Sequence, residues 1–365
     1  MRMRIVHMCR NLGTGGIEAV VCGLSNEMVK EHDVTVCTIV TPSSEDKFYK
    51  ELSPSVHRET IGRMGEGKPF SEMVRIAKFI KKGRYDIVHI HGFFYYFALA
   101  ISLFHGRTKF CYTVHSDAFH ENNPWDRRIL FYKRFCFKHG WIHPISISPA
   151  VQTSVKELYG CESKMIYDGV AQPIPDEKGI IEQYRVTSES RVFIHAARIC
   201  PEKNQMLLCR VFDKLIREGE DLVLLIAGPI HHHEIYAQLQ RYFSDRIRYI
   251  GDRSDIPSLL CSADGMCLSS SYEGLSMILL ESLAAGCIPV CTRVGGVVNV
   301  IKDGVEGFFA EEVTEASFYE AMKRRLNLTE DERIFMKKNC LDRSKSFTID
   351  RCAREYVSYY EILLR

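Results

Sequence analysis

The chain has 365 residues, with 46% hydrophobic and 26% charged residues and a formal net charge of +2. This balance is typical of globular proteins and excludes a disordered, collagen-like or simple coiled-coil chain. At about 150 residues per domain the length predicts two domains, and a dedicated nucleic-acid binder would usually be more basic.

Apolar runs of strand length alternate with helical stretches through the first half of the chain. Residues 5–9 predict a strand, and residues 17–30 predict a helix with apolar positions at helical spacing. Further strands are predicted at 34–40, 87–90, 109–114 and 145–148, with a helix at 73–82. Residues 167–175 are rich in turn-forming residues and predict a linker.

The same alternation begins again after the linker. It predicts strands at 191–196, 222–227, 247–250, 265–268, 288–292 and 307–310, and helices at 205–217, 233–242, 256–262, 275–285, 314–326, 330–343 and 349–365. Two such series predict an α/β protein with two doubly wound, Rossmann-like parallel-sheet domains facing a cleft. We place the domains at 1–168 and 169–346, followed by a C-terminal helix in 347–365.

Charged residues are distributed unevenly along the chain, whereas the cysteines are spread throughout it. Residues 1–170 hold 23 Lys and Arg against 17 Asp and Glu, which suggests an anionic partner or membrane surface, with random scatter as the alternative. The 14 cysteines are dispersed without a CxxC pair, which predicts reduced, buried thiols in a cytoplasmic protein. We expect no signal peptide, and the apolar run 93–104 is too short to span a bilayer.

Three loops that follow strands carry residues suited to ligand binding. The first contains Gly13, Gly15 and Gly16, whose bare backbone would let a phosphate approach the next helix, unless it is only a tight turn. Glu18 stands where a dinucleotide motif needs its third glycine. The second loop contains Arg198 and Lys203, and two fixed positive charges suit a diphosphate.

The third loop contains Glu273, and Glu281 follows two turns inside the predicted helix. A carboxylate in this apolar run would be costly unless it faced a polar cleft, and paired carboxylates suit sugar hydroxyl groups. Two glutamates at this spacing are common in helices. The flanking segments 269–274 and 284–290 are what make the pattern specific.

Together these motifs resemble the retaining glycosyltransferases of family 4, which have the two-domain GT-B architecture. Glu273-x7-Glu281 is similar to the family signature, and Arg198 with Lys203 resembles its diphosphate-binding pair. The loop with Gly15 and Gly16 resembles its glycine-rich loop, and segment 112–116 resembles the one that carries its active-site histidine, here His115. The resemblance covers nearly the whole chain.

Two positions depart from the family pattern. Asn299 stands where members often have Glu, and Asp168 precedes Gly169 where Asn is usual. The second change is expected to be neutral, because Asp also tolerates turn conformations.

The resemblance implies a hexosyltransferase that uses a nucleotide diphosphate sugar, for which a UDP-sugar is the expectation, and that needs no metal or other cofactor. The absence of Asp-x-Asp agrees with fixed cations in place of a metal. Domain 1–168 would bind a glycan or lipid-linked acceptor for surface polysaccharide synthesis, and 169–346 the donor. The final helix would cross back to the first domain.

The resemblance also implies individual roles. Arg198 and Lys203 would stabilise the leaving diphosphate, and the backbone at Gly15 and Gly16 would approach it. Glu281 would accept hydrogen bonds from the ribose, and His115 would line the sugar pocket. The donor sugar would be held by a set of adjacent residues: Glu273, Gly274, Leu275 and Ser276.

Residues 125–141 mix basic and aromatic side chains. On a helix, Arg127, Arg134 and Lys138 fall within about 40° of one another. This predicts that the helix contacts the inner face of an anionic membrane as a peripheral element. The alternative is a buried helix with one solvated stripe. The triplet 231–233 of histidines is predicted to be a solvated loop, not a metal site.

Three other functions stay open: a sugar-nucleotide epimerase on the same fold, a nicotinamide-dependent oxidoreductase, and a non-catalytic sugar-nucleotide sensor. The missing third glycine counts against the oxidoreductase. The complete set of two cations and two carboxylates counts against the sensor. Nucleic acid is not expected as a partner.

Overall fold

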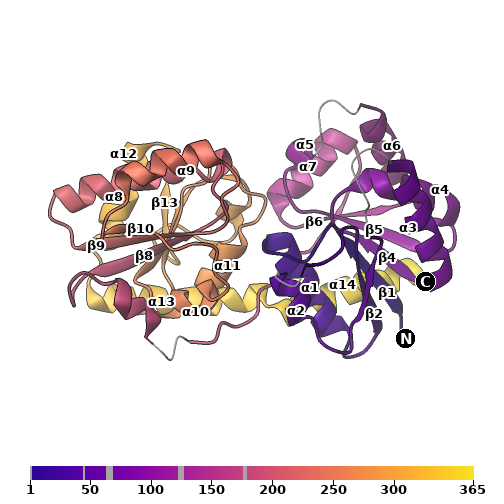
Figure 1. The fold of residues 1–365 in the computed structure, drawn as a ribbon, viewed down its shortest axis with the longest axis horizontal. Coiled ribbons are helices and arrows are strands. Elements are labelled where there is room, and N and C mark those ends of the chain that lie inside the picture. The colour runs from indigo at the N-terminus through magenta and orange to yellow at the C-terminus, as the bar shows by residue number, and fades with distance from the viewer. Residues whose placement is uncertain (1, 44–45, 63–68, 122–126, 176–178) are drawn as a thin grey trace. The chain divides into compact units, whose positions relative to one another are not determined.

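The chain forms two compact units in the computed structural model, which describes residues 2–43, 46–62, 69–121, 127–175 and 179–365. Unit 1 comprises Met1–Gly169 with Ile349–Arg365, and unit 2 comprises Val170–Thr348. In each unit a parallel sheet forms the centre and helices cover both of its faces (Figure 1). The predicted α/β fold with two doubly wound sheets is therefore confirmed.

Unit 1 is built on a seven-stranded sheet with the order β3-β2-β1-β4-β5-β6-β7. Its central strands are buried on both faces, as a parallel sheet covered by helices requires, and this explains their continuous apolar runs. The strands are β1 (Arg4–Cys9), β2 (Asp33–Thr38), β3 (His57–Thr60), β4 (Ile87–Ile90), β5 (Lys109–Val114), β6 (His143–Ser146) and β7 (Lys164–Met165).

The helices of unit 1 connect these strands. They are α1 (Gly16–Met28), α2 (Lys47–Glu51), α3 (Pro69–Gly83), η1 (Phe94–Phe97), α4 (Ala98–Phe104), α5 (Ala118–Glu121), α6 (Arg127–Lys138), α7 (Pro149–Tyr159) and α14 (Ile349–Leu364). Helix α14 follows unit 2 in the chain but packs along α1. Gly23 of α1 permits this approach, because a Cβ there would lie 2.8 Å from Ile349.

Unit 2 is built on a six-stranded sheet with the order β10-β9-β8-β11-β12-β13. Its strands are β8 (Arg191–Ala196), β9 (Leu222–Ala227), β10 (Ile247–Tyr249), β11 (Gly265–Leu268), β12 (Pro289–Thr292) and β13 (Phe308–Ala310). Its helices are η2 (Ile180–Tyr184), η3 (Pro201–Lys203), α8 (Gln205–Arg217), α9 (His233–Leu239), η4 (Gln240–Tyr242), α10 (Ile256–Ser262), α11 (Met277–Ala284), η5 (Gly295–Asn299), α12 (Glu315–Leu326), α13 (Glu330–Ser344) and η6 (Lys345–Phe347).

Helix α7 is the clearest element that the sequence analysis missed, although its signals are present. The hydroxyl of Ser148 accepts a hydrogen bond from the Val151 amide, and Pro149 occupies the first turn. Gly160 ends the helix in the left-handed conformation. The edge strands β3 and β7 were also not predicted, because they are too short to show a clear hydrophobic alternation.

Candidate active site

The site in unit 2 lies where the strand order reverses. Strands β8 and β11 are neighbours in the sheet. The chain continues from β8 to β9 on one side of this pair and from β11 to β12 on the other. Loop 197–204 follows β8, and loop 269–276 follows β11. Parallel strands end at one edge of a sheet, and ligands of open α/β sheets bind there. The fold therefore brings together two of the three loops singled out in the sequence.

Lys203 and Glu273 meet directly at this edge. The Nζ of Lys203 donates a hydrogen bond to Oε1 of Glu273 at 2.6 Å. The Glu273 side chain is only 7% exposed, whereas that of Lys203 is 19% exposed. The carboxylate is thus the buried end of the pair, and the ammonium, which has three donors, is the end that reaches the surface.

Close backbone packing holds Glu273 in place. The hydroxyl of Ser270 donates to its Oε1 at 2.6 Å, and the amide of Gly296 donates to its carbonyl at 3.1 Å. Gly295 has a φ of 46°, and a Cβ there would lie 1.8 Å from the Glu273 carbonyl oxygen. Only glycine permits this approach of the two backbones.

The other predicted residues of unit 2 lie around this pair. Arg198 is exposed on the loop after β8, and its backbone carbonyl accepts a hydrogen bond from Gln205 at 2.8 Å. Residues 274–276 are buried just before α11. Helix α11 begins at Met277, two residues later than predicted, so half-buried Glu281 lies little more than one turn inside it, not two.

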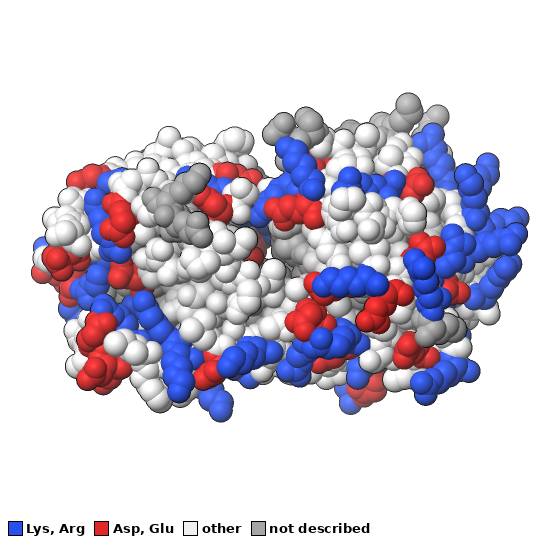
Figure 2. All heavy atoms as spheres, turned by 90° about the horizontal axis from the view of Figure 1, so that it is seen from below, with Lys and Arg blue, Asp and Glu red and all other residues white. Residues whose placement is uncertain are grey.

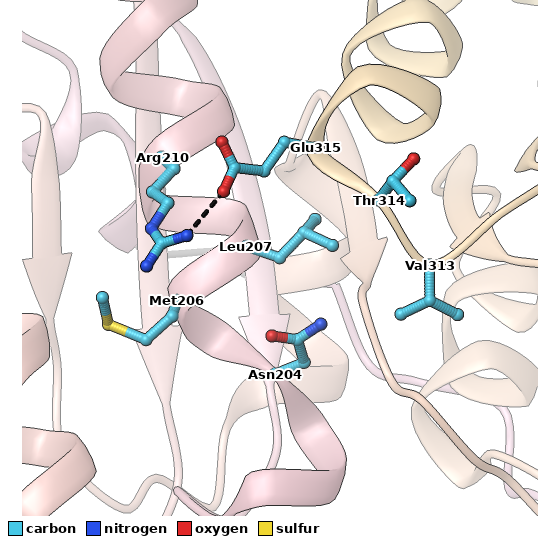
Figure 3. A pocket seen from close by; sticks show the side chains of 7 residues that line it. All are labelled: Asn204, Met206, Leu207, Arg210, Val313, Thr314 and Glu315. Carbon is cyan, nitrogen blue, oxygen red and sulfur yellow. Dashed lines mark hydrogen bonds and ion pairs between the residues drawn. The ribbon is translucent and has the colours of Figure 1, made fainter.

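A pocket of about 280 Å³ opens beside the same loop, between the start of α8 and the start of α12 (Figure 3). Arg210 and Glu315 point toward one another at its rim and form an ion pair at 2.6 Å. None of the predicted site residues lines it. The seven lining residues are Asn204, Met206, Leu207, Arg210, Val313, Thr314 and Glu315.

The site in unit 1 also lies where its strand order reverses, between β1 and β4. The glycine-rich loop follows β1: Gly15 has a φ of 152° and Gly16 is the first residue of α1. His115 follows β5, the neighbour of β4, and its side chain is 6% exposed.

Protein groups surround His115 on several sides. Its Nε2 lies 2.9 Å from Nδ1 of His91, and its Nδ1 lies 3.8 Å from Oδ2 of Asp168. Its backbone amide donates to Oε1 of Glu121 at 2.8 Å. Asp168 is 3% exposed, and its carboxyl group lies beside the imidazole, a contact that the sequence analysis did not foresee.

Glu121 also anchors a buried lysine from α6. Its Oε2 lies 3.6 Å from Nζ of Lys133, which is 2% exposed, and accepts a hydrogen bond from the Tyr112 hydroxyl at 3.1 Å. The ammonium lies 4.1 Å from the ring centre of Tyr112 and 5.1 Å from that of Tyr159, distances suited to cation–π attraction. Burial lowers the pKa of Lys133, and Glu121 opposes that shift.

Three more imidazoles lie near His115. His7 is on β1, His89 is on β4, and His91, which contacts His115, directly follows β4. Within the described part of the chain, His7, His89 and His91 form the one group of buried side chains close enough to share a metal ion. Burial lowers the pKa of His7 to about 3 and lowers the pKa of His89 and His91 well below the usual range. All three are therefore neutral near pH 7.

The sequence analysis did not single out these histidines, nor Glu121 and Lys133. The spacing of His89 and His91 places both side chains on one face of a strand inside an apolar run, which is a usable signal. His7 pairs with His89 across β1 and β4, and that register is decided by the sheet, not by the sequence nearby.

The basic helix differs in part from its prediction. Arg128, Arg134 and Lys138 are exposed on α6, whereas Lys133 is buried. The side chain of Arg127 and all of Trp125 lie outside the described residues. Exposed Phe131 lies on the same helix, and the triplet 231–233 is exposed as predicted.

Family comparisons divide the chain at the same place as the structure. Residues 14–171 match the model described as Glycosyltransferase Family 4, and residues 176–340 match the model described as Glycosyl transferases group 1. The first match falls in unit 1 apart from its last two residues, and the second falls in unit 2.

Individual relatives are distant. UDP-Gal:alpha-D-GlcNAc-diphosphoundecaprenol alpha-1,3-galactosyltransferase of Escherichia coli is 23% identical over 303 residues, which span 75% of this chain and 74% of that protein. N-acetyl-alpha-D-glucosaminyl L-malate synthase of Bacillus anthracis is 28% identical over 131 residues, 36% of this chain and 34% of that protein. The chain thus spans about a third of that relative's length.

A solved structure extends the likeness to the whole fold. The crystal structure of a glycosyltransferase from Rickettsia africae ESF-5 has 19% sequence identity and a TM-score of 0.84, over 100% of this chain and 99% of that one. With one family model on each unit and this fold throughout, the chain belongs to the family 4 glycosyltransferases and has their GT-B fold.

Proposed function

We propose that the protein transfers a sugar from a UDP-sugar to a glycan or lipid-linked acceptor in surface polysaccharide synthesis, with retention of configuration and without a metal ion. The Lys203–Glu273 pair at the reversal point of unit 2 is the observation that carries the proposal. The name of the Escherichia coli relative, which states a UDP-sugar and a diphosphoundecaprenol acceptor, supports both substrate classes.

The cations of unit 2 would neutralise the leaving diphosphate. Glu273 holds Lys203 by one of its three N–H donors, which leaves two for phosphate oxygens. Arg198 is exposed on the same loop and would add a forked donor. Removal of one such electrostatic group typically costs about 3–4 kcal/mol of barrier, and these fixed charges would do what a metal ion does elsewhere.

The remaining groups would hold the sugar nucleotide. Glu281 would accept hydrogen bonds from the ribose hydroxyls, and the buried segment 273–276 would hold the donor sugar. In unit 1, the backbone at Gly15 and Gly16 would approach the diphosphate, and His115 would line the sugar pocket. Attack on the face that the diphosphate leaves would retain the configuration, with the phosphate helping to remove the acceptor proton.

A thermal-shift panel of UDP, GDP, ADP and NAD with EDTA present tests this proposal. A ligand at 100 times its Kd should add about 2.7 kcal/mol to the free energy of unfolding. We expect UDP to raise the Tm of the wild type and to have a much smaller effect on Glu281→Ala. Glu320→Ala, an exposed change on α12, serves as the matched control and should keep the full UDP effect.

Each result of the panel decides between functions. Stabilisation by NAD alone would replace the transferase with the oxidoreductase, and loss of the UDP effect with EDTA would contradict metal independence. Consumption of a UDP-sugar without any acceptor would favour the epimerase.

We propose further that α6 touches an anionic membrane surface. Its Arg128, Arg134 and Lys138 are exposed, and Phe131 is 72% exposed beside them. Lys and Arg side chains also gather in the right-hand part of Figure 2, in the half that holds unit 1. A basic face with an exposed aromatic suits the interface of a bilayer. Among the described residues, no helix is long and apolar enough to cross a membrane.

Flotation with liposomes tests this contact. Vesicles with anionic lipid should carry the wild type upward, and neutral vesicles should not. Arg134→Glu with Lys138→Glu should stay in the bottom fraction. The matched change Lys214→Glu with Arg217→Glu on α8 should float like the wild type. A wild type that stays down with anionic vesicles would end the proposal.

A further inference from the structure

Four buried groups of unit 1 form one continuous line. Nδ1 of His7 lies 3.1 Å from Nε2 of His91, Nδ1 of His91 lies 2.9 Å from Nε2 of His115, and Nδ1 of His115 faces Oδ2 of Asp168 at 3.8 Å. We propose that Asp168 fixes the direction of hydrogen bonding along this line, so that each imidazole carries its proton on Nδ1 and His115 is held in one ring orientation.

The inner imidazoles can be linked in only two ways. His7 and His91 are neutral, so each has one N–H donor and one lone pair. A donor at Nδ1 of His91 requires an acceptor at its Nε2, and the choice at one ring therefore sets the choice at the next. The line points either toward Asp168 or away from it.

The Asp168 end favours the first direction. An imidazole nitrogen that faces a carboxylate keeps its proton, because a lone pair there would face negative charge. His115 then carries its proton on Nδ1 and accepts through Nε2 from His91. Among the described residues, Oδ1 of Asp168 has no hydrogen-bond partner. The side chains of Cys352 and Tyr356 also interact with this carboxylate, and burial raises the pKa of both, so neither carries charge.

The His7 end favours the same direction independently. Nε2 of His7 is buried and has no hydrogen-bond partner among the described residues. With the proton on Nδ1 this atom is a bare lone pair, whereas the opposite direction would bury an unpaired N–H donor. Orphaned buried N–H groups are the rarer of the two in native proteins. Both ends of the line therefore select the Nδ1–H form.

A metal ion shared by the histidines fits these contacts less well. Nδ1 of His89 lies 2.5 Å from the Tyr360 hydroxyl, and its Nε2 lies 2.7 Å from that of Thr113. Both nitrogens of His91 are also engaged. An ion would have to break several of these bonds in a site without a carboxylate among its three nearest groups.

The consequence for catalysis rests on the proposed function of His115. A hydrogen bond at Nε2 and the attraction of a carboxylate at Nδ1 restrain the turning of the ring, so the edge and backbone that it offers to a sugar keep one geometry. Asp168 and His91 act through His115 and are positioning residues. Loss of such outer support typically costs about 10–100-fold in activity.

Nitrogen NMR of the full chain labelled with 15N-histidine tests the direction of the line. Long-range 1H–15N spectra show which ring nitrogen lacks its proton. Variants in which one histidine at a time is replaced assign the signals. We expect the bare nitrogen at Nε2 in His7, His91 and His115. A bare Nδ1 in His115, averaging of its two forms, or one equivalent of bound zinc in the purified protein would overturn the proposal.

Kinetics of sugar transfer test the positioning role. Asp168→Asn should lower kcat about tenfold or more and leave KM for the nucleotide sugar within about twofold. His91→Leu should do the same, whereas His91→Asn, which restores a donor toward His115, should recover part of the loss. Asp86→Asn, the same chemical change at the start of β4, should keep both constants.

The two proposals can fail separately. Unchanged kcat in Asp168→Asn, with the wild type active, would overturn the positioning role alone. A wild type that transfers no sugar would overturn the proposed function and the role within it. The spectra decide the direction of the line in either case.

Discussion

The two units each contain a lysine paired with a glutamate, and the pairs are built in opposite ways. In unit 1 the ammonium of Lys133 is the buried end, enclosed by aromatic rings, and Glu121 is 14% exposed. In unit 2 the carboxylate of Glu273 is the buried end, and Lys203 is the more exposed partner. In the first arrangement the buried ammonium depends on its partner, because breaking a buried pair leaves an uncompensated charge, and the second leaves a cation within reach of an anion.

The rest of the two sites follows the same contrast. Unit 1 holds His115 within neutral, buried imidazoles, whereas unit 2 presents charges on loops at the edge of its sheet. In the buried site of unit 1, hydrogen bonds mainly determine how the side chains are oriented. In the partly exposed site of unit 2, charge mainly determines which ligand can bind. Four perturbations test this contrast, in decreasing order of their expected effect on stability. They are acid, substitution of a buried ion, crowding of the backbone and loss of a surface ion pair.

Acid should weaken unit 1 before unit 2. The pKa of His7 is lowered to about 3, and those of His89 and His91 are lowered too, so the unfolded chain binds protons that the folded unit rejects. Stability therefore falls as pH drops below about 6.5. For His7 the loss amounts to about 1 kcal/mol per pH unit down to its folded pKa, and His89 and His91 act in the same direction. In unit 2, burial lowers the pKa of His195 to about 4, which acts in the same direction. Among the described residues of unit 2, His195 is the one fully buried histidine.

Hydrogen exchange with mass spectrometry at pH 7, 6 and 5 measures this difference. Peptides from β1, β4 and β5 should lose protection before peptides from β8 and β9. Replacement of the exposed triplet 231–233 by glutamines serves as the control and should leave the pH dependence unchanged. Loss of protection in β8 first would contradict the contrast between the units.

Glu121→Ala should destabilise unit 1 by about 3–5 kcal/mol, because it leaves the buried ammonium of Lys133 without its counter-charge. It also removes the acceptor of the His115 amide. Urea denaturation measures the loss. The double variant Glu121→Leu with Lys133→Met should recover a large part of it, and a double variant no more stable than the single one would show that the charge is not the cause.

Gly295→Ala should disturb unit 2 more than Gly304→Ala does. Both glycines have a positive φ, which costs about 1–2 kcal/mol for alanine. At Gly295 the added Cβ would also lie 1.8 Å from the Glu273 carbonyl oxygen, whereas at Gly304 it would meet only the flexible end of Arg324 at 3.9 Å. Urea midpoints and the UDP-induced shift in Tm compare the variants. Equal losses would mean that backbone strain alone matters.

Glu315→Ala should have the smallest effect. Its ion pair with Arg210 is 51% exposed on both sides, and such surface pairs contribute about 0.2–1 kcal/mol. The loss should shrink further in 1 M salt, in contrast to the loss from Glu121→Ala. Two urea titrations, at low and high salt, measure both. An equal salt effect on the two variants would contradict the contrast between buried and exposed pairs.

Much of the fold could be predicted because local sequence signals are strong there. Strand β5 and helix α8 begin and end at the predicted residues, since their apolar periodicity and flanking turns are clear. The loops with Arg198, Lys203 and Glu273 could be singled out because they follow such strands. The short strands β3 and β7 carry too little pattern to be found.

The meaning of Asp168 and Lys133 could not be predicted in the same way. Asp168 in a turn and Lys133 in a basic helix both suggest exposed residues when only their neighbours in sequence are considered. Each is buried by elements far along the chain: Asp168 lies beside His115 of the β5 loop, and Lys133 lies beside Glu121 and the rings of Tyr112 and Tyr159.

The sequence by itself determined the alternation of strands and helices, the division into two sheets and the loops that carry the charged residues, because these depend on periodicity and local backbone preferences. The tertiary structure decided which end of each Lys–Glu pair is buried, that His7 lies beside His89, and that a carboxylate faces His115. Those outcomes depend on strand order and register, which bring distant residues into contact and remove them from water.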